Sequence, residues 1–177
     1  LDLSTGEFLC AEIKLRAIAT ELARLMPGEI VVSDTMLAAS AKMDWYGEWA
    51  ARLTPYTEAR FDSRFGERRL TSLYEVTSLD AFGNFSRPEL AACGALVDYL
   101  EMTQAGRLPH LTPPRQVATL DALAIDPATR RNLELTRTLN GETKGSLLDT
   151  IDRTVTGAGA RLLSQHLSAP LVSPASI

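Results

Sequence analysis

Arginine is the residue type whose spacing in this chain could support recognition chemistry. Arg60, Arg64 and Arg68 recur at every fourth position, which would line three guanidinium groups along one face of a helix. Guanidinium groups bind carboxylates and phosphates through paired, charge-assisted hydrogen bonds. The stripe is therefore a candidate docking surface for an acidic partner, and its ordinary alternative is a solvated helix face.

Four further candidate arginines lie near the C-terminal end: Arg130, Arg131, Arg153 and Arg161. Adjacent residues on a helix point about 100° apart, so Arg130 and Arg131 cannot both face the same neighbour. One of the two is expected to form a structural ion pair with a carboxylate such as Asp152 or Glu134, and the other to be exposed. Contact with the DNA backbone is the functional alternative for all four.

Carboxylates could support a different chemistry, which is metal-dependent cleavage of a phosphodiester. Such sites need three or four carboxylates that converge on cations ~3.5–4 Å apart, and Asp2 in a predicted strand could begin the set. The other candidates lack a spacing that would focus them, so we expect solvated surface acids. These candidates are Glu29, Asp34, Glu58, Asp62 and Asp98.

Histidine, cysteine and glycine offer no better site. His110 lies among prolines, and His166 lies on an apolar helix face where we expect it to be half buried. Cys10 and Cys93 lack metal-site spacing and are expected to be buried, reduced thiols. Residues 141–146 have the wrong spacing for a phosphate-binding loop. We therefore predict no catalytic, cofactor-binding or metal-binding residue in this chain.

Charge and composition narrow the class of protein. The chain has 177 residues, of which 45% are hydrophobic, and a formal net charge of −4. Residues 1–110 hold 11 Lys and Arg against 16 Asp and Glu, whereas residues 111–177 hold 7 against 6. Neither part has the concentrated positive charge of a nucleic-acid-binding module. No apolar run approaches the roughly 20 residues that span a bilayer, so we expect no membrane association.

The first two thirds of the chain alternate strand-like and helix-like patterns, which predicts an α/β domain. Residues 1–3 and 7–13 should form a hairpin, followed by a helix over residues 15–26 and a buried strand at 30–32, with a right-handed crossover between the strands. A weak helix should begin at Asp34, an edge strand should cover residues 53–57, and a helix should cover 62–70. The segment around Trp45 and Trp49 has no clear pattern.

The longest predicted helix begins at Pro88 and ends at Gly106, with its apolar residues, including Met102, pointing inward. Prolines at 109, 113 and 114 then mark the best domain boundary. A small hairpin is expected over residues 116–125, and helices are expected to begin at Asp126, near Leu147 and after Thr156.

The segment DPATRRNLEL, followed by SLLDTIDRTVTGAGARLL, closely resembles the start of the core, or lever, domain of the MutS family of DNA mismatch repair proteins. LDLSTGEF, the pair Phe82-Gly83, GALVDYL and LPH resemble the family's connector domain in the same order. The resemblance implies a ribonuclease-H-like α/β connector over residues 1–111, truncated at its N-terminus. The first helices of the all-α core domain, also truncated, then follow over 112–177. His166 stands where the family usually carries Trp.

The same resemblance implies a non-catalytic fragment that transmits conformational signals between mismatch-binding, ATPase and MutL-docking regions. ATP and Mg would act in a domain of the full-length parent that is absent here. Expected partners are MutL at the connector and, through the parent, mismatched duplex DNA and a second copy in a homodimer. The expected location is the bacterial cytoplasm, at the nucleoid. Two alternatives remain open: a MutS-like paralogue without a mismatch role, and a ribonuclease-H-like metal-dependent nuclease.

Overall fold

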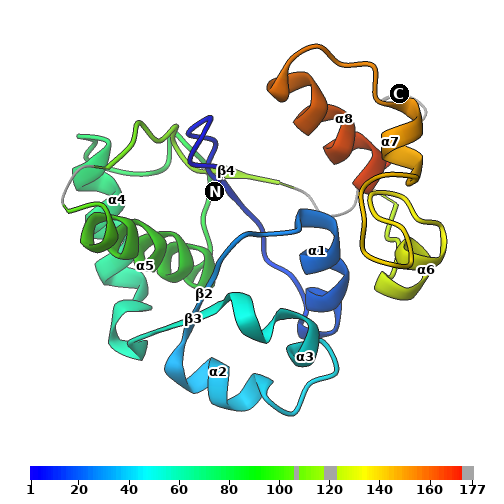
Figure 1. The fold of residues 1–177 in the computed structure, drawn as a ribbon. Coiled ribbons are helices and arrows are strands. Elements are labelled where there is room, and N and C mark those ends of the chain that lie inside the picture. The colour runs from blue at the N-terminus through cyan, green and yellow to red at the C-terminus, as the bar shows by residue number, and fades with distance from the viewer. Residues whose placement is uncertain (106–107, 118–122, 173–177) are drawn as a thin grey trace. The chain divides into compact units, whose positions relative to one another are not determined.

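The computed structural model describes residues 1–105, 108–117 and 123–172 (Figure 1). These residues form two compact units. Unit 1 combines Leu1–Glu12 with the chain from Gly28 to Ala118, and unit 2 combines Ile13–Pro27 with the chain that follows residue 118. Each unit contains elements that are distant in sequence. The predicted domain boundary at residues 111/112 stays a prediction.

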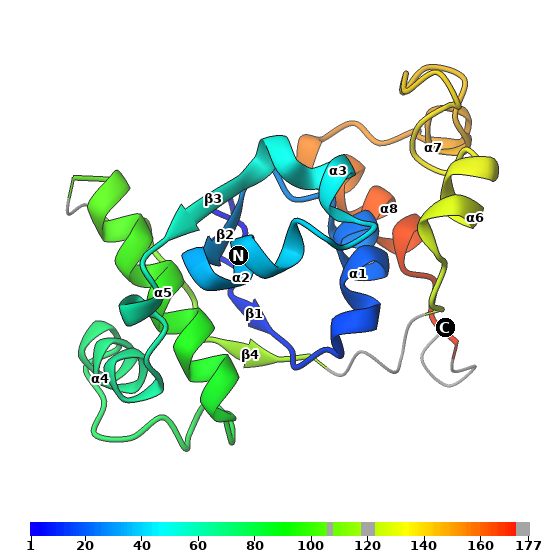
Figure 2. The ribbon, with the colours of Figure 1, turned by 90° about the horizontal axis from the view of Figure 1, so that it is seen from below.

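Unit 1 contains two small parallel sheets among helices, which is compatible with the predicted α/β class. Strand β2 (Ile30–Ser33) pairs with β3 (Leu53–Tyr56), and β1 (Leu9–Cys10) pairs with β4 (Arg115–Gln116) (Figure 2). The edge-strand prediction for residues 53–57 is confirmed, and Pro55 lies opposite Val32 in the register. The strand order of a ribonuclease-H-like sheet is not visible in these two pairs and stays an inference from family membership.

Two predictions about the start of the chain are wrong. Residues 1–3 form no strand, and β1 pairs with β4 instead of with its sequence neighbour. Leu1 and Leu3 are too exposed to build a buried strand, at 38% and 48%. The predicted crossover between β1 and β2 is also wrong, because these strands belong to different sheets and the helix between them belongs to unit 2.

Helices α4 (Ser63–Leu73) and α5 (Arg87–Thr103) form the largest packed pair of unit 1 (Figure 1). Helix α5 begins with a capping box, in which the Ser86 and Glu89 side chains each bond the other's backbone, and with proline in its first turn. The two helices approach closely because Gly66 and Gly94 face each other. A Cβ added to Gly94 would lie 2.2 Å from the Gly66 Cα.

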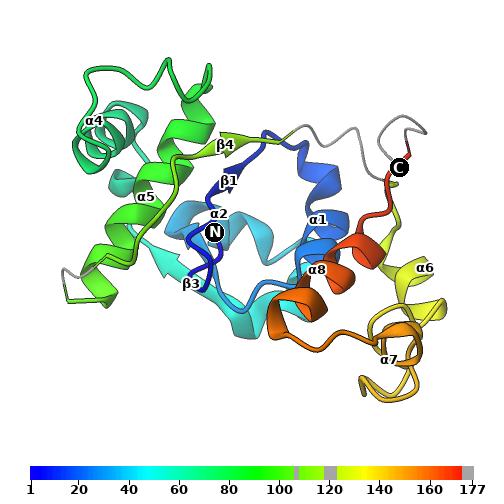
Figure 3. The same cartoon turned by 90° about the horizontal axis from the view of Figure 1, so that it is seen from above.

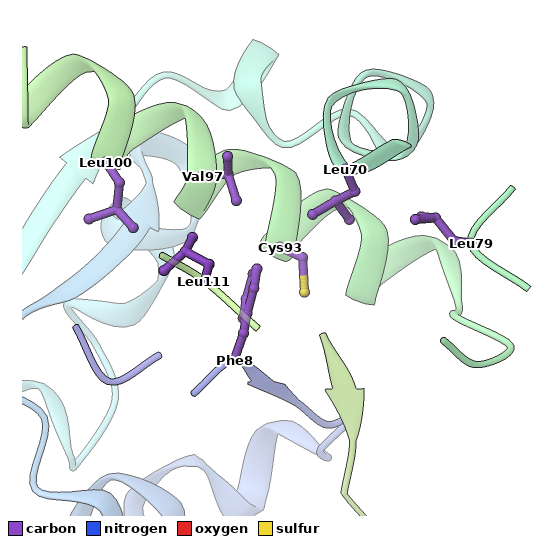
Figure 4. Packing of buried hydrophobic residues seen from close by; sticks show 7 residues of the cluster. All are labelled: Phe8, Leu70, Leu79, Cys93, Val97, Leu100 and Leu111. Atoms are coloured by element: carbon purple, nitrogen blue, oxygen red, sulfur yellow. The ribbon is translucent and has the colours of Figure 1, made fainter. Parts of the chain in front are cut away.

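A hydrophobic cluster beneath α5 forms the core of unit 1 (Figure 4). Phe8 from the β1 side and Leu70 from α4 are each only 1% exposed, and Val97 of α5 is fully buried. The inward prediction is confirmed for Val97 and Leu100 but is wrong for Met102, which is 61% exposed at the end of the helix. The predicted stop at Gly106 lies outside the described residues. The cluster consists of Phe8, Leu70, Leu79, Cys93, Val97, Leu100 and Leu111.

Short helices complete unit 1. Helix α2 (Asp34–Ser40) begins where predicted, with Ser33 as its N-cap, and α3 (Tyr46–Trp49) continues into the 3₁₀ turn η2 (Ala50–Arg52). Trp45 and Trp49 are 8% and 2% exposed, so the segment without a clear sequence pattern supplies buried aromatic rings.

Unit 2 is built from helices. The 3₁₀ turn η1 (Leu15–Ala17) leads into α1 (Ile18–Leu25), which contacts both α6 (Pro127–Asn132) and α8 (Gly157–Ser168) (Figure 3). Helix α7 (Leu147–Ile151) lies between α6 and α8 in sequence.

The predicted helix starts in unit 2 are confirmed. Asp126 accepts hydrogen bonds from the backbone N–H groups of Ala128 and Thr129, and Thr156 caps α8 by accepting from the Gly159 N–H. These caps satisfy first-turn donors that have no partner within the helix.

The structure departs from two other expectations for this part of the chain. His166 is exposed instead of half buried, because the α8 face that carries it and Leu162 is not covered by the described residues. The hairpin predicted over residues 116–125 lies partly outside the described residues, and Leu123–Ile125 form no strand. None of the described helices is both long enough and apolar enough to cross a membrane.

Candidate functional site

The first residue of the predicted arginine stripe, Arg60, lies in the element that precedes α4. Asp62 caps α4 by accepting from the Phe65 N–H at 2.8 Å, so the helix starts after Arg60, which lies in the 3₁₀ turn η3 (Glu58–Arg60). The Arg60 guanidinium turns toward α5, and its Nη1 lies 3.3 Å from Oδ2 of Asp98. Arg60 therefore lies just before the helix that carries Arg64 and Arg68, and its guanidinium pairs with Asp98 instead of extending the stripe.

Asp98 is the centre of a buried polar network that the sequence did not reveal. It is 7% exposed, although we expected a solvated surface acid. Its carboxylate receives the Tyr56 hydroxyl at 2.6 Å, and it forms ion pairs with Arg60 and Arg69. Arg69 also pairs with Glu101, one turn further along α5. The network thus connects β3, η3 and α4 to one face of α5.

The surroundings of Tyr56 favour its protonated, hydrogen-bond-donating form. Burial raises the pKa of Tyr56, and the hydrogen bond and negative charge of Asp98 raise it further. The phenol therefore remains a donor to the carboxylate well above neutral pH. Two cationic neighbours compensate the buried charge of Asp98, which would otherwise be costly.

The ring of Phe65 packs against the guanidinium groups of Arg60 and Arg69, the two arginines that pair with Asp98. The guanidinium carbons of Arg69 and Arg60 lie 4.9 and 5.8 Å from the centre of its ring. Both distances are within the range of a cation–π contact. Arg60 and Arg69 are therefore structural groups held by Asp98 and Phe65.

Arg64 and Arg68 are the free part of the predicted stripe. Both are exposed on α4, and the Nε of Arg68 donates to the Arg64 carbonyl at 3.3 Å. Neither forms an ion pair with any residue that the structure describes. We call these two side chains the α4 arginine pair. Two exposed guanidinium groups one helical turn apart can donate hydrogen bonds to a carboxylate or a phosphate of a partner.

Arg130 departs from its predicted role as an ion-pair partner. It is 7% exposed, and its Nη2 donates to the carbonyl of Ser168 at the end of α8, at 2.6 Å. The carboxylates of Glu134 and Asp152 accept from Leu139 and Thr154 instead. Arg130 therefore does not form the ion pair expected of one of the two adjacent arginines, and it connects α6 to the C-terminal end of α8.

The buried Arg130 side chain is incompletely satisfied. Its Nε and Nη1 atoms have no hydrogen-bond partner among the described residues. Burial lowers the pKa of this guanidinium, and the positive charge of Arg24 on α1 lowers it further. Arg24 itself pairs with Glu21 of the same helix at 2.7 Å. Arg130 is thus a structural group with unused donors.

The other three arginines of this group are exposed and lie on separate elements: Arg131 on α6, Arg153 after α7 and Arg161 on α8. Arg153 donates to the carbonyl of its own neighbour Asp152 at 2.9 Å. The structure does not bring these three side chains together into a patch. Their role at a DNA backbone stays a prediction.

The acidic residues do not assemble into a metal centre in the described part of the chain. The structure places no group of three or more His, Cys, Asp or Glu side chains there in a metal-binding arrangement. Asp2 accepts from the backbone N–H and the hydroxyl of Ser4, at 2.7 and 2.6 Å, which fixes its carboxylate in a local turn. The nuclease alternative therefore gains no support from the described residues.

Comparison with known proteins also divides the chain into two parts, but it places residues 13–27 with the first part, whereas the structure places them in unit 2. Residues 1–112 match the family model described as MutS domain II, and residues 128–177 match MutS domain III. The chain belongs to the MutS family. The two matched domains are distinct from the ATPase domain of that family.

Individual MutS relatives cover nearly the whole chain. The DNA mismatch repair protein MutS of Cereibacter sphaeroides is 51% identical over 169 residues, which is 96% of this chain. The MutS proteins of Ruegeria pomeroyi and Bradyrhizobium sp. are 50% and 48% identical, over 96% and 100% of the chain. The chain spans 19% of the length of each of these relatives.

Proposed function

We propose that this chain is the connector and lever part of a MutS mismatch repair protein, and that it transmits conformational signals without performing catalysis itself. MutL would dock on unit 1, and unit 2 would transmit movement toward the mismatch-binding and ATPase regions. In the longer protein, ATP and Mg would act in a separate domain, and two copies would assemble around mismatched DNA. Family membership and the absence of the ATPase domain from the matched range support this proposal.

The α4 arginine pair is the observation that carries the docking part of the proposal. Residues 1–110 have an excess of acidic over basic side chains, so two free guanidinium groups there stand out. The Asp98 network holds α4 against α5 and occupies Arg60 and Arg69, which leaves Arg64 and Arg68 on a rigid support. A preformed surface loses little conformational freedom when a partner binds.

Charge reversal of this pair tests the docking proposal. We expect the chain to bind MutL, with affinity that falls as salt rises from 50 to 300 mM because the contact is electrostatic. The double variant Arg64→Glu/Arg68→Glu should weaken binding at least tenfold in a calorimetric titration. The matched control, Arg153→Glu/Arg161→Glu in unit 2, should change affinity less than twofold. Equal effects of the two double variants would place the docking surface elsewhere.

Nucleic-acid binding and ATP hydrolysis test the non-catalytic part. We expect the isolated chain to hydrolyse no ATP and to bind matched and mismatched duplexes equally weakly at physiological salt, because neither part of the sequence concentrates positive charge. A tenfold or larger preference for the mismatch would contradict this expectation. Divalent-metal-dependent nicking of DNA that the substitution Asp2→Asn abolishes would instead support the nuclease alternative.

A further inference from the structure

The loop that joins α6 to α7 (Figure 1) carries the one Asn-Gly pair in the sequence, Asn140-Gly141. Both residues are exposed. Gly141 has a φ of +82°, and a Cβ placed on it would meet no atom within 4 Å. With no side chain on Gly141 and no neighbour packed against it, the peptide nitrogen between the two residues is sterically open to the Asn140 side chain.

A short hydrogen-bonded turn holds this pair at the surface. The Gly141 N–H donates to the Thr138 carbonyl, and the Thr138 N–H donates to the Glu142 carbonyl, both at 2.8 Å. The Thr138 hydroxyl lies 3.2 Å from the Glu142 carbonyl oxygen and 3.2 Å from its nitrogen. No residue from 137 to 142 is buried. Water can therefore replace these bonds, and the turn can open without exposing a core side chain.

We propose that Asn140 is a site of spontaneous deamidation, at which the chain converts the asparagine to isoaspartate and aspartate through a cyclic imide with Gly141. Family membership assigns no modification to this loop. The reaction starts from the opened turn, because the Gly141 nitrogen must leave the Thr138 carbonyl before it can attack. The folded chain should therefore react more slowly than the unfolded segment, but still react.

The reaction balances with water as the only co-reactant. A base removes the Gly141 amide proton, the nitrogen attacks Cγ of Asn140, and a C–N bond forms. The bond from Cγ to Nδ2 then breaks, and the side-chain nitrogen leaves as ammonia with the proton returned to it. Water opens the imide at either carbonyl: cleavage at Cγ gives aspartate, and cleavage at the main-chain carbonyl gives isoaspartate. One ammonia is released, one water is consumed, and no electron is transferred.

The chain provides its own comparison, because it has two other asparagines. Asn84 and Asn132 are also exposed, but they precede Phe85 and Leu133. A side chain on the following residue hinders the approach of its nitrogen to Cγ of the asparagine. Exposure is thus common to all three asparagines, and the following residue is what distinguishes the Asn-Gly pair.

Deamidation would change the loop in two ways. It adds a negative charge two residues before Glu142, and the isoaspartyl product adds one carbon to the main chain inside the turn that Thr138 closes. The same loop joins the start of α7 to the end of α6, because the Leu147 N–H donates to the Glu134 carbonyl at 2.9 Å. The modification therefore acts on the connection between two helices of unit 2.

Timed incubation of the full chain at mildly alkaline pH tests the proposal. Peptide mapping by mass spectrometry should show Asn140 converted at least tenfold faster than Asn84 or Asn132, and faster as pH rises because a base starts the reaction. The product should accept a methyl group from S-adenosylmethionine when isoaspartyl methyltransferase is added as a reagent. A synthetic peptide of residues 136–146 sets the rate of the unfolded segment.

Two substitutions provide the controls. Gly141→Ala should slow the conversion of Asn140 at least tenfold, because a methyl group then hinders the attacking nitrogen. Thr138→Val should speed it, because the hydroxyl that contacts Glu142 is lost and the turn opens more easily. The peptide map of the unsubstituted chain decides the matter even if a variant folds poorly. Intact Asn140 in the folded chain while the peptide converts, or equal rates at all three asparagines, would overturn the proposal.

Discussion

The two units differ in how completely the described residues bury their large apolar side chains. Unit 1 has a buried cluster beneath α5, a glycine contact between two long helices and a compensated buried carboxylate. Unit 2 has helices of 6, 5 and 12 residues after α1, and many of its large apolar side chains are exposed. These exposed residues include Leu133, Leu139, Leu147, Ile151, Val155 and Leu162.

This difference indicates where the stability of the chain resides. Helices of five to twelve residues are marginal on their own, and most helical stability comes from tertiary packing. We therefore expect unit 1 to unfold cooperatively and unit 2 to open more easily, or to pair with another copy through Leu162, Leu163 and Leu167. A compact monomer whose α8 amides are strongly protected from exchange would contradict this expectation.

The substitution Gly94→Val should have the largest effect on unit 1. Its Cβ would collide with the Gly66 backbone, and both α4 and α5 would have to separate. We expect a loss of more than about 3 kcal/mol in the free energy of unfolding. Both tryptophans lie in unit 1, so a urea titration followed by tryptophan fluorescence measures this loss.

Gly47→Ala is the matched control for that titration. A Cβ at Gly47 would meet no atom within 4 Å, and the residue lies in α3. Alanine is the better helix former, so stability should stay the same or rise by up to about 1 kcal/mol. If both glycine variants lost stability equally, close approach of α4 and α5 would not be what holds unit 1 together.

A pair of leucine truncations compares the two units directly. Leu70→Ala removes a side chain that is 1% exposed, and we expect it to cost about 2–5 kcal/mol. Leu162→Ala removes one that is 53% exposed in unit 2, and it should change stability by less than about 0.5 kcal/mol. Thermal unfolding by circular dichroism distinguishes them. A cost at Leu162 similar to that at Leu70 would show that α8 is covered in solution.

Arg130→Met should have only a small effect, despite the burial of the residue. The substitution removes one hydrogen bond to Ser168 but also removes two buried donors without a partner. Since each unsatisfied donor costs about 1–3 kcal/mol, we expect the opening free energy of α6 and α8 to be unchanged or to rise by about 1 kcal/mol.

Native-state hydrogen exchange of peptides from α6 and α8 measures that opening free energy. Arg131→Met at the neighbouring exposed position is the control for the loss of charge. A loss of more than about 2 kcal/mol in the Arg130 variant alone would mean that its free donors are satisfied in solution.

Alkaline pH should destabilise unit 1 through Tyr74. Burial raises the pKa of Tyr74 to about 12, with a further contribution from Cys93, and its hydroxyl donates to the Thr112 carbonyl at 2.9 Å. A folded-state pKa above the ordinary value of about 10 means that the stabilisation is complete below pH 10 and is lost as pH rises toward 12.

Tyr74→Phe removes this titration, so its stability should fall less steeply between pH 10 and 12. All four tyrosines lie in unit 1, and unit 2 cannot lose stability by this route. Urea midpoints measured at several alkaline pH values provide the comparison. Parallel curves for the two proteins would exclude Tyr74 as the group responsible.

Local signals explain which parts of the fold could be predicted from sequence. The helix starts at Asp126 and Thr156, the long helix at Pro88 and the edge strand at Pro55 each depend on chemistry within a few residues. The pairing of β1 with β4 could not be predicted in the same way, because it joins residues more than one hundred positions apart. Strand partners depend on the whole fold, which local patterns do not record.

Local sequence patterns also predict only part of the candidate site. Arg64 and Arg68 can be identified from their spacing, but the spacing of Asp98 does not distinguish it from a surface acid. One signal could have found it, since Asp98 lies one turn after Gly94 and next to Val97, on the side of α5 that faces α4. Its partners Tyr56 and Arg69 come from other elements, so their convergence required the folded structure.

Hydrogen exchange of the chain with and without MutL tests the central claim most directly, because it compares both units in one experiment. The account predicts that MutL slows exchange in α4, around Arg64 and Arg68, and leaves α6 to α8 unchanged. Slower exchange in α6 to α8 with no change in α4 would contradict it, and would assign docking to the unit that we regard as the lever.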